Sequence, residues 1–456
     1  MVFNPQRIRD PIHNIIGFEG NQFENMLWEL INTRPFQRLR RVKQLGFSDL
    51  VYPGATHSRF AHSVGVFHIA RRMMKIIETH LRSKNEFQEA QAQHALAAAL
   101  LHDVGHGAFS HAFETVGKRL NIEMAKHETV SKKLILDSEI ADCLKKMGAG
   151  FHKDVADVID DDVSATLYSA VISSQFDADR LDYIQRDRMM CGTGHGAIDF
   201  EWLVENIQVG EVQFGVDEER VGKQQTFVIG PKAIAAAETF VFGLFQLYPT
   251  VYFHKTTRGA EKLFTELLVR VIELSGNGRS ARTGLPENHP LVQFANDSDS
   301  IDNVLCLDDS VVWSALHLLA DSEDELIASF SDRLRRRKLY KVIDVREEFR
   351  KQEKDEDALD KSCAQMKIKI EEWARKDSSP FPRILVDDCK RSPYKEYKEE
   401  KGPLNQINVL DNGDLRDLRD VSDVVKAIKD FKAFRVYVDD DDQEAKKFTN
   451  DAIREI

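Results

Sequence analysis

The sequence predicts a mainly α-helical protein with a small α+β lobe in its C-terminal part. Apolar residues recur at spacings of three and four through most of the first two-thirds of the chain, which is typical of helices that bury one face. Strand-like segments are short, and one of them, 434–438, lies close to the C-terminal end. With 456 residues, of which 42% are hydrophobic, the chain is long enough for two or three compact units.

The expected elements follow in order along the chain. Helical periodicity predicts four long helices, over 92–101, 167–190, 233–245 and 259–274. Strands are expected at 212–216, 226–229 and 434–438. Turn-forming residues indicate a loop over 275–300 and a linker over 392–402, and two further helices are expected within 308–340.

Composition excludes some classes of function. Acidic residues outnumber basic ones, 75 to 63, and the net charge of -12 argues against a protein whose whole surface binds nucleic acid. The basic run 335–338 leaves a local nucleic-acid contact open, although the solvated end of a helix explains it better.

The expected cellular setting is intracellular. The five cysteines are scattered and form no CxxC pair, which suits a reducing compartment and offers no thiolate zinc site. The first residues lack a signal pattern, and no segment approaches the length of a membrane span. We therefore expect a soluble cytoplasmic protein without a membrane partner.

The most informative motif is the run 102–111, which contains three histidines, one aspartate and one serine. It follows directly on the apolar stretch 95–101, and a core helix has no packing reason to end in such a cluster. The adjacent imidazole and carboxylate of His102 and Asp103 are the nitrogen and oxygen donors that hold divalent first-row metals.

Two further segments complete a pattern. The segment 57–66 contains His62, and the segment 176–187 contains Asp179. The order His…His-Asp…Asp resembles the HD-domain metal phosphohydrolases. That resemblance implies a helical HD core and four protein ligands: His62, His102, Asp103 and Asp179. Mixed nitrogen and oxygen ligation suits one divalent transition metal (Fe, Mn, Co, Ni or Zn), with Mg²⁺ as a further candidate beside the substrate phosphates.

Five motifs narrow the resemblance to the deoxynucleoside triphosphate triphosphohydrolases, in the branch that includes a vertebrate enzyme with SAM and HD domains. They lie at 36–40, 43–46, 52–55, 59–66 and 177–183, and no segment here reads as a SAM domain. On this resemblance we expect an HD catalytic domain (1–275), a helical extension of it (276–390) and the α+β lobe (391–456). The resemblance also implies a homo-oligomer, a dimer or a tetramer.

The resemblance implies roles for four residues near the metal. His127 would be the general acid or base, and Glu114, where the relatives usually carry Asp, would be its partner. His106 and His111 would face the phosphates and neutralise developing charge. From the residues alone, a turn histidine between two glycines is the alternative for His106, and an exposed histidine is the alternative for His127.

Spacing along one predicted helix indicates a substrate pocket. Asp179, Tyr183 and Asp187 stand at i, i+4 and i+8, so they share one helical face that suits a metal, a sugar or base, and a 3′-hydroxyl. Arg180 lies one step round that helix, where it could meet a phosphate. A charged amphipathic helix is the alternative.

Further substrate contacts come from three other segments. Arg59 lies three residues before His62, which places a guanidinium on the metal side of the same helix as a clamp for phosphate. By resemblance, Gln44 and Leu45 would contact the sugar, and Tyr252 would flank the sugar and base. A packed core aromatic is an equally good interpretation of Tyr252.

The resemblance has two departures. Leu244 stands where the related vertebrate enzyme has a basic residue that holds the triphosphate, so Lys255 or Arg258 would have to supply that contact. At the family's regulatory nucleotide site, four residues match: Gln37, Arg40, His254 and Lys255. Three do not: Asn32, Gln208 and Gly230.

Three functions remain. The leading one is metal-dependent hydrolysis of a deoxynucleoside triphosphate to a deoxynucleoside and inorganic triphosphate. The second keeps the metal chemistry but acts on another nucleotide, such as a monophosphate, a cyclic nucleotide or an oligonucleotide. The third is a binding module that senses nucleotides without turnover.

Overall fold

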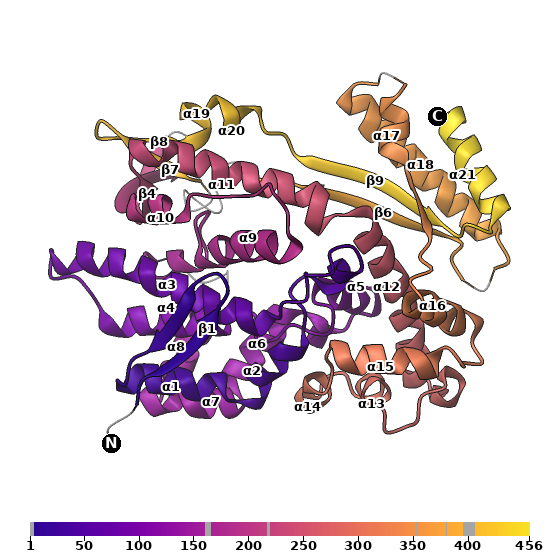
Figure 1. Cartoon of the computed structure of the whole chain (residues 1–456), viewed down its shortest axis with the longest axis horizontal. Coiled ribbons are helices and arrows are strands. Elements are labelled where there is room, and N and C mark those ends of the chain that lie inside the picture. The colour runs from indigo at the N-terminus through magenta and orange to yellow at the C-terminus, as the bar shows by residue number, and fades with distance from the viewer. Residues whose placement is uncertain (1–3, 160–165, 217–218, 353, 380, 395–405) are drawn as a thin grey trace.

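The computed structural model of the chain describes residues 4–159, 166–216, 219–352, 354–379, 381–394 and 406–456. Helices make up most of the molecule (Figure 1), and two of the three small sheets in the described residues contain strands from the C-terminal part of the chain. The prediction of a mainly α-helical chain with small sheets in its C-terminal part is confirmed. The linker expected at 392–402 lies mostly outside the described residues.

Three helices form the centre of the site. Helix α3 (Arg59–Arg82) packs against α4 (Glu89–Leu101) on one side and α9 (Ala178–Cys191) on another. Helix α3 contributes buried side chains to both large hydrophobic cores. At Gly65 a Cβ atom would stand 2.0 Å from Oδ1 of Asp182, so only glycine lets α3 and α9 approach this closely.

The other helices of the first half surround this centre. They are α1 (Gln22–Ile31), α2 (Arg34–Arg38), α5 (His111–Leu120), α6 (His127–Leu136), α7 (Glu139–Leu144), α8 (Phe151–Ile159) and α10 (Phe200–Glu205). Short 3₁₀ turns connect several of them, and the turn Gly46–Leu50 packs against the later helix α12.

A second group of helices packs around α12. It contains α12 (Lys255–Gly276), α13 (Pro290–Asn296), α14 (Ile301–Leu305), α15 (Asp309–Leu319) and α16 (Glu325–Arg335). Helix α11 (Ile234–Leu247) packs instead against α9 and α10. A π-helical turn, Tyr248–Tyr252, joins α11 to α12. Helix α12 also touches α5, which brings this group to the edge of the site.

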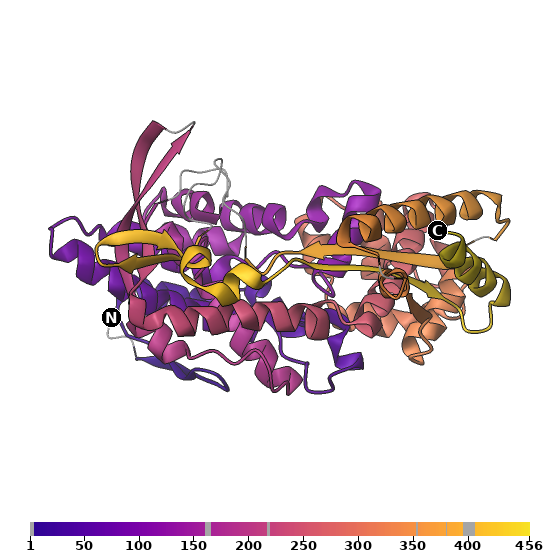
Figure 2. The same ribbon diagram turned by 90° about the horizontal axis from the view of Figure 1, so that it is seen from above.

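Three small sheets complete the fold. An N-terminal hairpin pairs β1 (Gln6–Asp10) with β2 (Asn14–Phe18). A four-stranded sheet has the order β3 (Ile207–Val216), β4 (Glu219–Ile229), β7 (Asn408–Asp411) and β8 (Asp414–Asp417). A three-stranded sheet has β9 (Phe431–Val438) between β5 (Lys341–Asp344) and β6 (Ile384–Arg391). Figure 2 shows β3 and β4 projecting away from the helical body.

The last helices lie beside the three-stranded sheet. They are α17 (Val345–Arg350), α18 (Glu356–Lys376) and α21 (Gln443–Glu455), which gather at one end of the molecule (Figure 1). The short α19 (Leu418–Val421) and α20 (Asp423–Ala427) lie elsewhere, where α19 contacts β8 and α20 contacts α11. Strands on both sides of position 390 share sheets, because β9 pairs with β5 and β6, and β7 pairs with β4. The division into three domains stays a prediction.

Two of the expected elements are corrected. The single helix predicted over 167–190 is wrong: a 3₁₀ turn, Ser169–Val171, is followed by α9, whose backbone N–H at Arg180 donates to the capping carboxylate of Asp177 at 2.7 Å. Apolar spacing continues across this break, so periodicity alone could not locate it. The loop predicted over 275–300 contains α13, which begins with Pro290 in its first turn.

One segment also contradicts the expectation that nothing approaches the length of a membrane span. Residues Pro231–Tyr252, which include α11, form a 22-residue helical run that is long and apolar enough to cross a bilayer by length and composition alone. Its side chains at Phe240, Leu244 and Leu247 are buried in a hydrophobic core of the protein, and a core helix passes the same test. Leu244 itself is 2% exposed.

Candidate active site

The four predicted metal ligands lie together where α3, the end of α4 and the start of α9 meet. The ligand atoms of His62, His102 and Asp103 all lie within 4.8 Å of one another. Nε2 of His62 is 3.0 Å from Oδ1 of Asp179 and 3.6 Å from Oδ2 of Asp103. Nε2 of His102 is 3.8 Å from the same Asp179 oxygen.

The two imidazoles are turned so that each presents Nε2 to this group. Nδ1 of His62 donates to Oδ2 of Asp182 at 2.8 Å, and Nδ1 of His102 donates to the backbone carbonyl of Ala99 at 2.9 Å. Both Nε2 atoms are buried, and neither has a hydrogen-bond partner among the described residues. Buried nitrogens left in this way suit a metal ion, since a ligating histidine commonly donates its other ring N–H to a carboxylate or a carbonyl.

The charges of the carboxylates fit a cation. Burial favours the neutral form of Asp103, but the neighbouring Arg59, His102 and His106 bring its pKa well below its ordinary value. Burial likewise opposes the ionised form of Asp179, and the adjacent imidazole of His62 lowers its pKa. Two imidazoles and two ionised carboxylates are a suitable donor set for a divalent transition metal.

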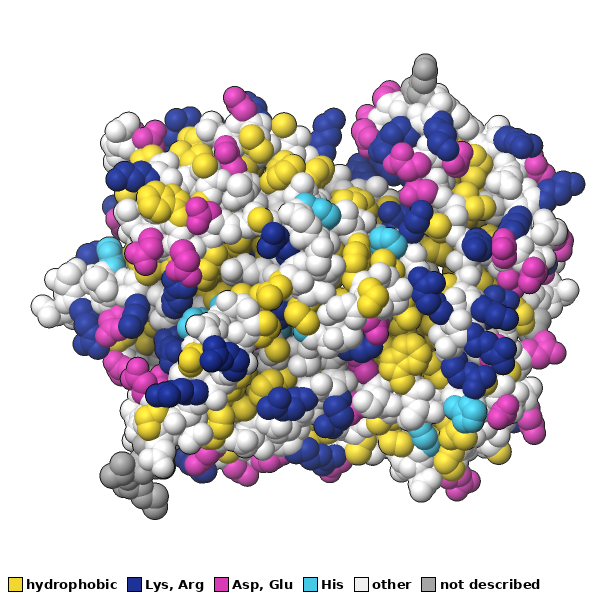
Figure 3. All heavy atoms as spheres, viewed as in Figure 1, with side chains coloured by type: hydrophobic (Ala, Val, Ile, Leu, Met, Phe, Trp, Pro, Cys, Tyr) yellow, Lys and Arg dark blue, Asp and Glu magenta, His cyan; other side chains and the backbone are white. Residues whose placement is uncertain are grey.

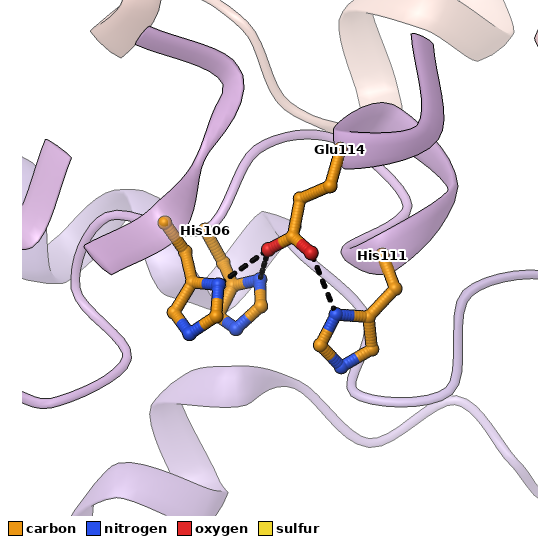
Figure 4. A group of neighbouring side chains, drawn as sticks. His106, His111 and Glu114 are labelled. Carbon is orange, nitrogen blue, oxygen red and sulfur yellow. Dashed lines mark hydrogen bonds and ion pairs between the residues drawn. The ribbon is translucent and has the colours of Figure 1, made fainter. Parts of the chain in front are cut away.

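A second cluster lies beside the first one. The ligand atoms of His106, His111, Glu114 and His127 lie within 4.8 Å of one another, and Figure 4 shows the Glu114 carboxylate between the imidazoles. Oε2 of Glu114 accepts from Nδ1 of His111 at 3.0 Å, and Oε1 contacts Nδ1 of His127. The rings of His106 and His127 stack with centroids 4.0 Å apart. Nε2 of His106 is 3.2 Å from Oδ1 of Asp103, which joins the two clusters.

The pKa values of the two stacked histidines are shifted in opposite directions. Burial opposes protonation of His127, but its hydrogen bond with Glu114 raises its pKa above the ordinary value. Burial and the charge of Arg59 hold the pKa of His106 well below its ordinary value. Environments that push the pKa values of neighbouring groups apart help to assign acid and base roles, and here the shifts favour His127 over His106 as the proton donor.

Arg59 lies between the clusters with a buried guanidinium. Its Nε donates to Oγ of Ser110 at 2.8 Å, and its Nη1 donates to Oδ2 of Asp103. Because only 3% of Arg59 is exposed, this cation is held in place beside the candidate metal site.

A third group lies farther along α9. Asp187 accepts from Nε2 of His57 at 2.8 Å and from the hydroxyl of Tyr252 at 2.9 Å. The rings of Tyr183 and Tyr252 meet edge to face with centroids 5.9 Å apart. Burial raises the pKa of both phenols well above the ordinary value, so both are neutral hydroxyl groups.

The other predicted substrate residues differ in how far other groups of the protein already engage their side chains. Oε1 of Gln44 is buried without a hydrogen-bond partner among the described residues, while its backbone N–H donates to the carbonyl of His57 at 3.0 Å. Leu45 packs against the same hydrophobic core as the two tyrosines. The guanidinium of Arg180 is turned away toward the carbonyl of Ser174 (2.7 Å) and Oε1 of Gln175 (3.1 Å).

Several basic residues named from the sequence are engaged elsewhere. Arg258 pairs with Asp387 at 2.6 Å and with Glu261 at 2.5 Å, so its charge is already balanced. In the basic run, Arg335 and Arg336 pair with Asp332. Figure 3 shows Lys and Arg side chains interspersed with acidic and apolar ones over the face of the molecule that is seen in Figure 1.

The sequence patterns did not identify the residues that hold the His62 imidazole in place, namely Asp182 and its partners His13 and Arg186. Asp182 accepts from His62, from Nε2 of His13 at 2.7 Å and from two nitrogens of Arg186 at 2.8 and 2.9 Å. Its position three residues after Asp179 on the same helix was the available signal. His13 gave none, since it belongs to the distant N-terminal hairpin.

Known proteins share this arrangement of sequence and fold. The HD domain matches residues 59–183, and an HD-associated region matches 216–283. The protein YwfO of Bacillus subtilis is 34% identical over 340 residues, which cover 74% of this chain and 71% of that protein. A mouse protein named deoxynucleoside triphosphate triphosphohydrolase SAMHD1 is 26% identical over 390 residues, covering 75% of this chain and 55% of the mouse protein.

The fold has a solved counterpart. A phosphohydrolase from Bacteroides thetaiotaomicron superposes with a TM-score of 0.71 at 24% identity, covering 95% of this chain and all of that one. The chain spans about half the length of several other curated relatives it matches. The matched HD domain contains all the residues of the candidate metal site, and the similarity to YwfO extends well beyond that domain. The chain belongs to the HD-domain family of phosphohydrolases, with a core that resembles the SAMHD1 dNTP triphosphohydrolases.

Proposed function

We propose that this protein hydrolyses deoxynucleoside triphosphates to a deoxynucleoside and inorganic triphosphate. The observation that carries the proposal is the shared face of α9. Asp179 lies among the candidate metal ligands at one end of that face, and Asp187, held by His57 and Tyr252, lies at the other. Eight residues of helix correspond to about 12 Å. That length leaves room for a sugar between a metal-bound phosphate and a carboxylate that accepts from the 3′-hydroxyl.

The metal would be held by His62, His102, Asp103 and Asp179, and when bound it would polarise the phosphate and lower the pKa of water. We propose one divalent transition metal (Fe, Mn, Co, Ni or Zn), with Mg²⁺ on the remaining phosphates.

The chain's own residues supply the rest of the chemistry. Arg59 binds a phosphate oxygen beside Asp103, and His111 faces the same region from the start of α5. Water adds to the α-phosphorus and releases one proton to solvent, while the bond from phosphorus to the 5′-oxygen breaks. His127, protonated through Glu114, gives its proton to that 5′-oxygen.

The neutral groups around Asp187 favour a deoxyribose. The buried Oε1 of Gln44 lacks a partner among the described residues, and it would accept from a donor on the nucleotide. Leu45 and the rings of Tyr183 and Tyr252 present apolar surface beside it. A ribose would place its additional 2′-hydroxyl against such surface without a partner, which is costly.

The names of relatives agree with this proposal, since curated relatives from mouse and Dictyostelium discoideum are named as dNTP triphosphohydrolases or their homologues. We further propose a homo-oligomer, a dimer or a tetramer, in the cytoplasm. All five cysteines are free, as a reducing compartment requires.

A second candidate is hydrolysis of a different nucleotide by the same site. It is favoured by Leu244, which is buried in the core where a triphosphate contact was expected, and by Arg258, whose charge is balanced by Asp387 and Glu261. Both observations remove a phosphate contact from the far end of the substrate.

One experiment separates the two candidates. Metal-loaded protein is incubated with each dNTP, each rNTP, nucleoside monophosphates and cyclic nucleotides, and products are resolved by ion chromatography. Tripolyphosphate together with deoxynucleoside supports the first proposal. Orthophosphate, or turnover of a monophosphate or cyclic nucleotide alone, would favour the second candidate. The Asp179→Ala variant should lose both metal and turnover.

A further inference from the structure

Two segments that line the candidate site are joined by one carboxylate from outside the HD domain. They are the segment that begins at Lys43 and the turn Phe109–Ser110 that leads into α5. Asp309, the first residue of α15, accepts from the backbone N–H of Phe109 through Oδ1 at 2.7 Å. Its Oδ2 accepts from the backbone N–H of Lys43 at 3.0 Å. Asp309 is 3% exposed, so these bonds are protected from water.

The turn that Asp309 holds has an unusual backbone. Phe109 and Ser110 have φ angles of 55° and 56°, a region that residues other than glycine rarely adopt. Such conformations persist where the surroundings fix them, and they gather at functional sites. The ring of Phe109 stacks on that of Phe47 with centroids 4.2 Å apart, which further fixes the turn.

Ser110 connects this turn to the candidate metal site. It occupies the capping position before α5, but its hydroxyl does not cap the helix. Instead the hydroxyl donates to the carbonyl of Lys43 at 2.9 Å and accepts from Nε of Arg59 at 2.8 Å. Arg59 in turn contacts Asp103, so hydrogen bonds run without a gap from α15 to a candidate metal ligand.

The two segments also touch through their backbones. Gly46 has a φ of +50°, and a Cβ there would stand 3.3 Å from the carbonyl oxygen of Phe109. A shift of one segment would therefore move the other one. Gln44, whose buried Oε1 is available to substrate, lies between Lys43 and this contact.

We propose that Asp309 is a positioning residue. It holds the segment that begins at Lys43, which carries Gln44, and the turn Phe109–Ser110 in the geometry that the site requires. This inference rests on the proposed hydrolysis at the site, but the contacts that carry it do not depend on which nucleotide is cleaved. Asp309 touches no substrate itself, since it acts through the backbones of Lys43 and Phe109.

The ionised carboxylate is the form that makes both bonds, because each oxygen accepts one N–H. Burial raises the pKa of Asp309 to about 6 against the opposing effect of these two N–H groups. The charged groups around it are Lys43 and Asp308, together with Arg38 and Arg41, which belong to the same cluster of charges. At pH 8 the group is ionised. An asparagine would keep the shape but turn an NH₂ group toward one of the N–H donors.

The matched comparison is Asp309→Asn against Asp308→Asn at pH 8. Asp308 is equally buried at the same helix end, but it accepts from the N–H of Val311 and from Arg41 and contacts neither segment. With saturating metal, Asp309→Asn should lower kcat/KM by between about tenfold and a hundredfold, the range expected when a site is displaced by a fraction of an ångström to one ångström. Asp308→Asn should stay near the wild-type value.

Hydrogen–deuterium exchange supplies a readout that needs no turnover. In Asp309→Asn, peptides covering 43–46 and 109–111 should both exchange faster, and in Asp308→Asn neither should change. Ser110→Ala removes another bond of the same network, so the test does not depend on the Asp309 variant folding. This variant should also lower kcat/KM. The combined loss of kcat/KM in the double variant should be smaller than the product of the two single losses.

Faster exchange confined to α15, or an unchanged kcat/KM in Asp309→Asn, would overturn the positioning role. Absence of tripolyphosphate from the wild-type reaction would overturn the proposed function alone. The exchange comparison would still decide the role of Asp309.

Discussion

Oδ2 of Asp182 accepts the Nδ1 proton of His62 at 2.8 Å, and this bond decides which face of the imidazole meets the metal ligands. With Nδ1 protonated, the lone pair is on Nε2, which lies 3.0 Å from Asp179. Asp182 is itself fixed by His13 and by two nitrogens of Arg186. A carboxylate behind a ligating histidine orients the ring and raises its basicity.

We therefore expect Asp182→Asn to weaken metal binding by about ten- to a hundredfold, the usual effect of removing such a carboxylate. The loss also leaves Arg186 with less negative charge, so stability should fall as well. Metal affinity is measured by titration with a competing chelator.

The matched control is Asp10→Asn. Asp10 pairs with Arg186 at 2.8 Å from the other side and does not contact His62. Asp10 also accepts from the backbone N–H of His13 at 2.9 Å, so both variants disturb Arg186 and His13, but only Asp182 accepts from His62. Asp10→Asn should therefore reduce stability while metal affinity stays within about twofold. Equal losses of metal affinity in both variants would show that Asp182 acts through general stability and not through His62.

Glu114→Gln tests the proposed general acid. Burial opposes the charge on His127, and the Glu114 carboxylate overcomes it and raises the pKa of His127. Without that charge His127 is neutral near pH 7 and has no proton to give. We expect kcat to fall by about 10²- to 10⁴-fold with metal content unchanged.

The pH dependence of the rate should also change in a defined direction in Glu114→Gln. A required acid makes the rate fall as pH rises through its pKa, so the alkaline limb should move to lower pH in the variant. Glu128→Gln is the control, because Glu128 is exposed and lies 3.9 Å from Nε2 of the same histidine. A limb that stays in place would show that His127 is not the acid.

The pair of Glu114 and His127 should also make the free energy of unfolding depend on pH. The pKa of Glu114 is held well below its ordinary value, since hydrogen bonds from His111 and His127 outweigh burial. Its contribution is present above about pH 4.3 and is lost as pH falls through the folded-state pKa. The pKa of His127 is raised, so its contribution is complete below about pH 6.5 and is lost as pH rises through the folded-state pKa.

The free energy of unfolding of metal-free wild-type protein should therefore exceed that of Glu114→Gln most between about pH 4.5 and 6.5. The difference should be about 1–3 kcal/mol there, the range for a hydrogen bond to a charged group. It should narrow by pH 9, as measured by urea unfolding. An equal difference at pH 5.5 and 9 would mean that the pair is not charged.

Much of the fold could be predicted because its signals are local. The helices around 92–101, 233–245 and 259–274 were visible in apolar spacing, and α4, α11 and α12 contain them with only their ends displaced. The break before α9 was missed because apolar residues continue across it, and only the capping Asp177 marks the true start.

In the candidate site, too, some residues are visible in local sequence motifs and others are not. The four predicted ligands come from short motifs whose residue types are unusual at the end of an apolar helix. Two residues that contact the surroundings of these ligands, His13 and Asp309, come from a hairpin and a late helix. A lone histidine or aspartate in such places has no distinguishing neighbour in the sequence. Their roles follow from tertiary contacts that no local pattern encodes.

Leu244 stands at the position where the resemblance implies a basic residue that binds triphosphate. The side chain is 2% exposed and packs in the core of α11, so Leu244→Arg would place a charge among apolar groups instead of restoring a phosphate contact. We expect a loss of several kcal/mol in the free energy of unfolding, with no gain in tripolyphosphate release. Phe242→Arg is the matched control: it lies on the same helix, is 41% exposed, and should change stability by only about 0.5 kcal/mol. If Leu244→Arg folds with wild-type stability and releases tripolyphosphate faster, the side chain faces the substrate, and the far end of the pocket lies along α11.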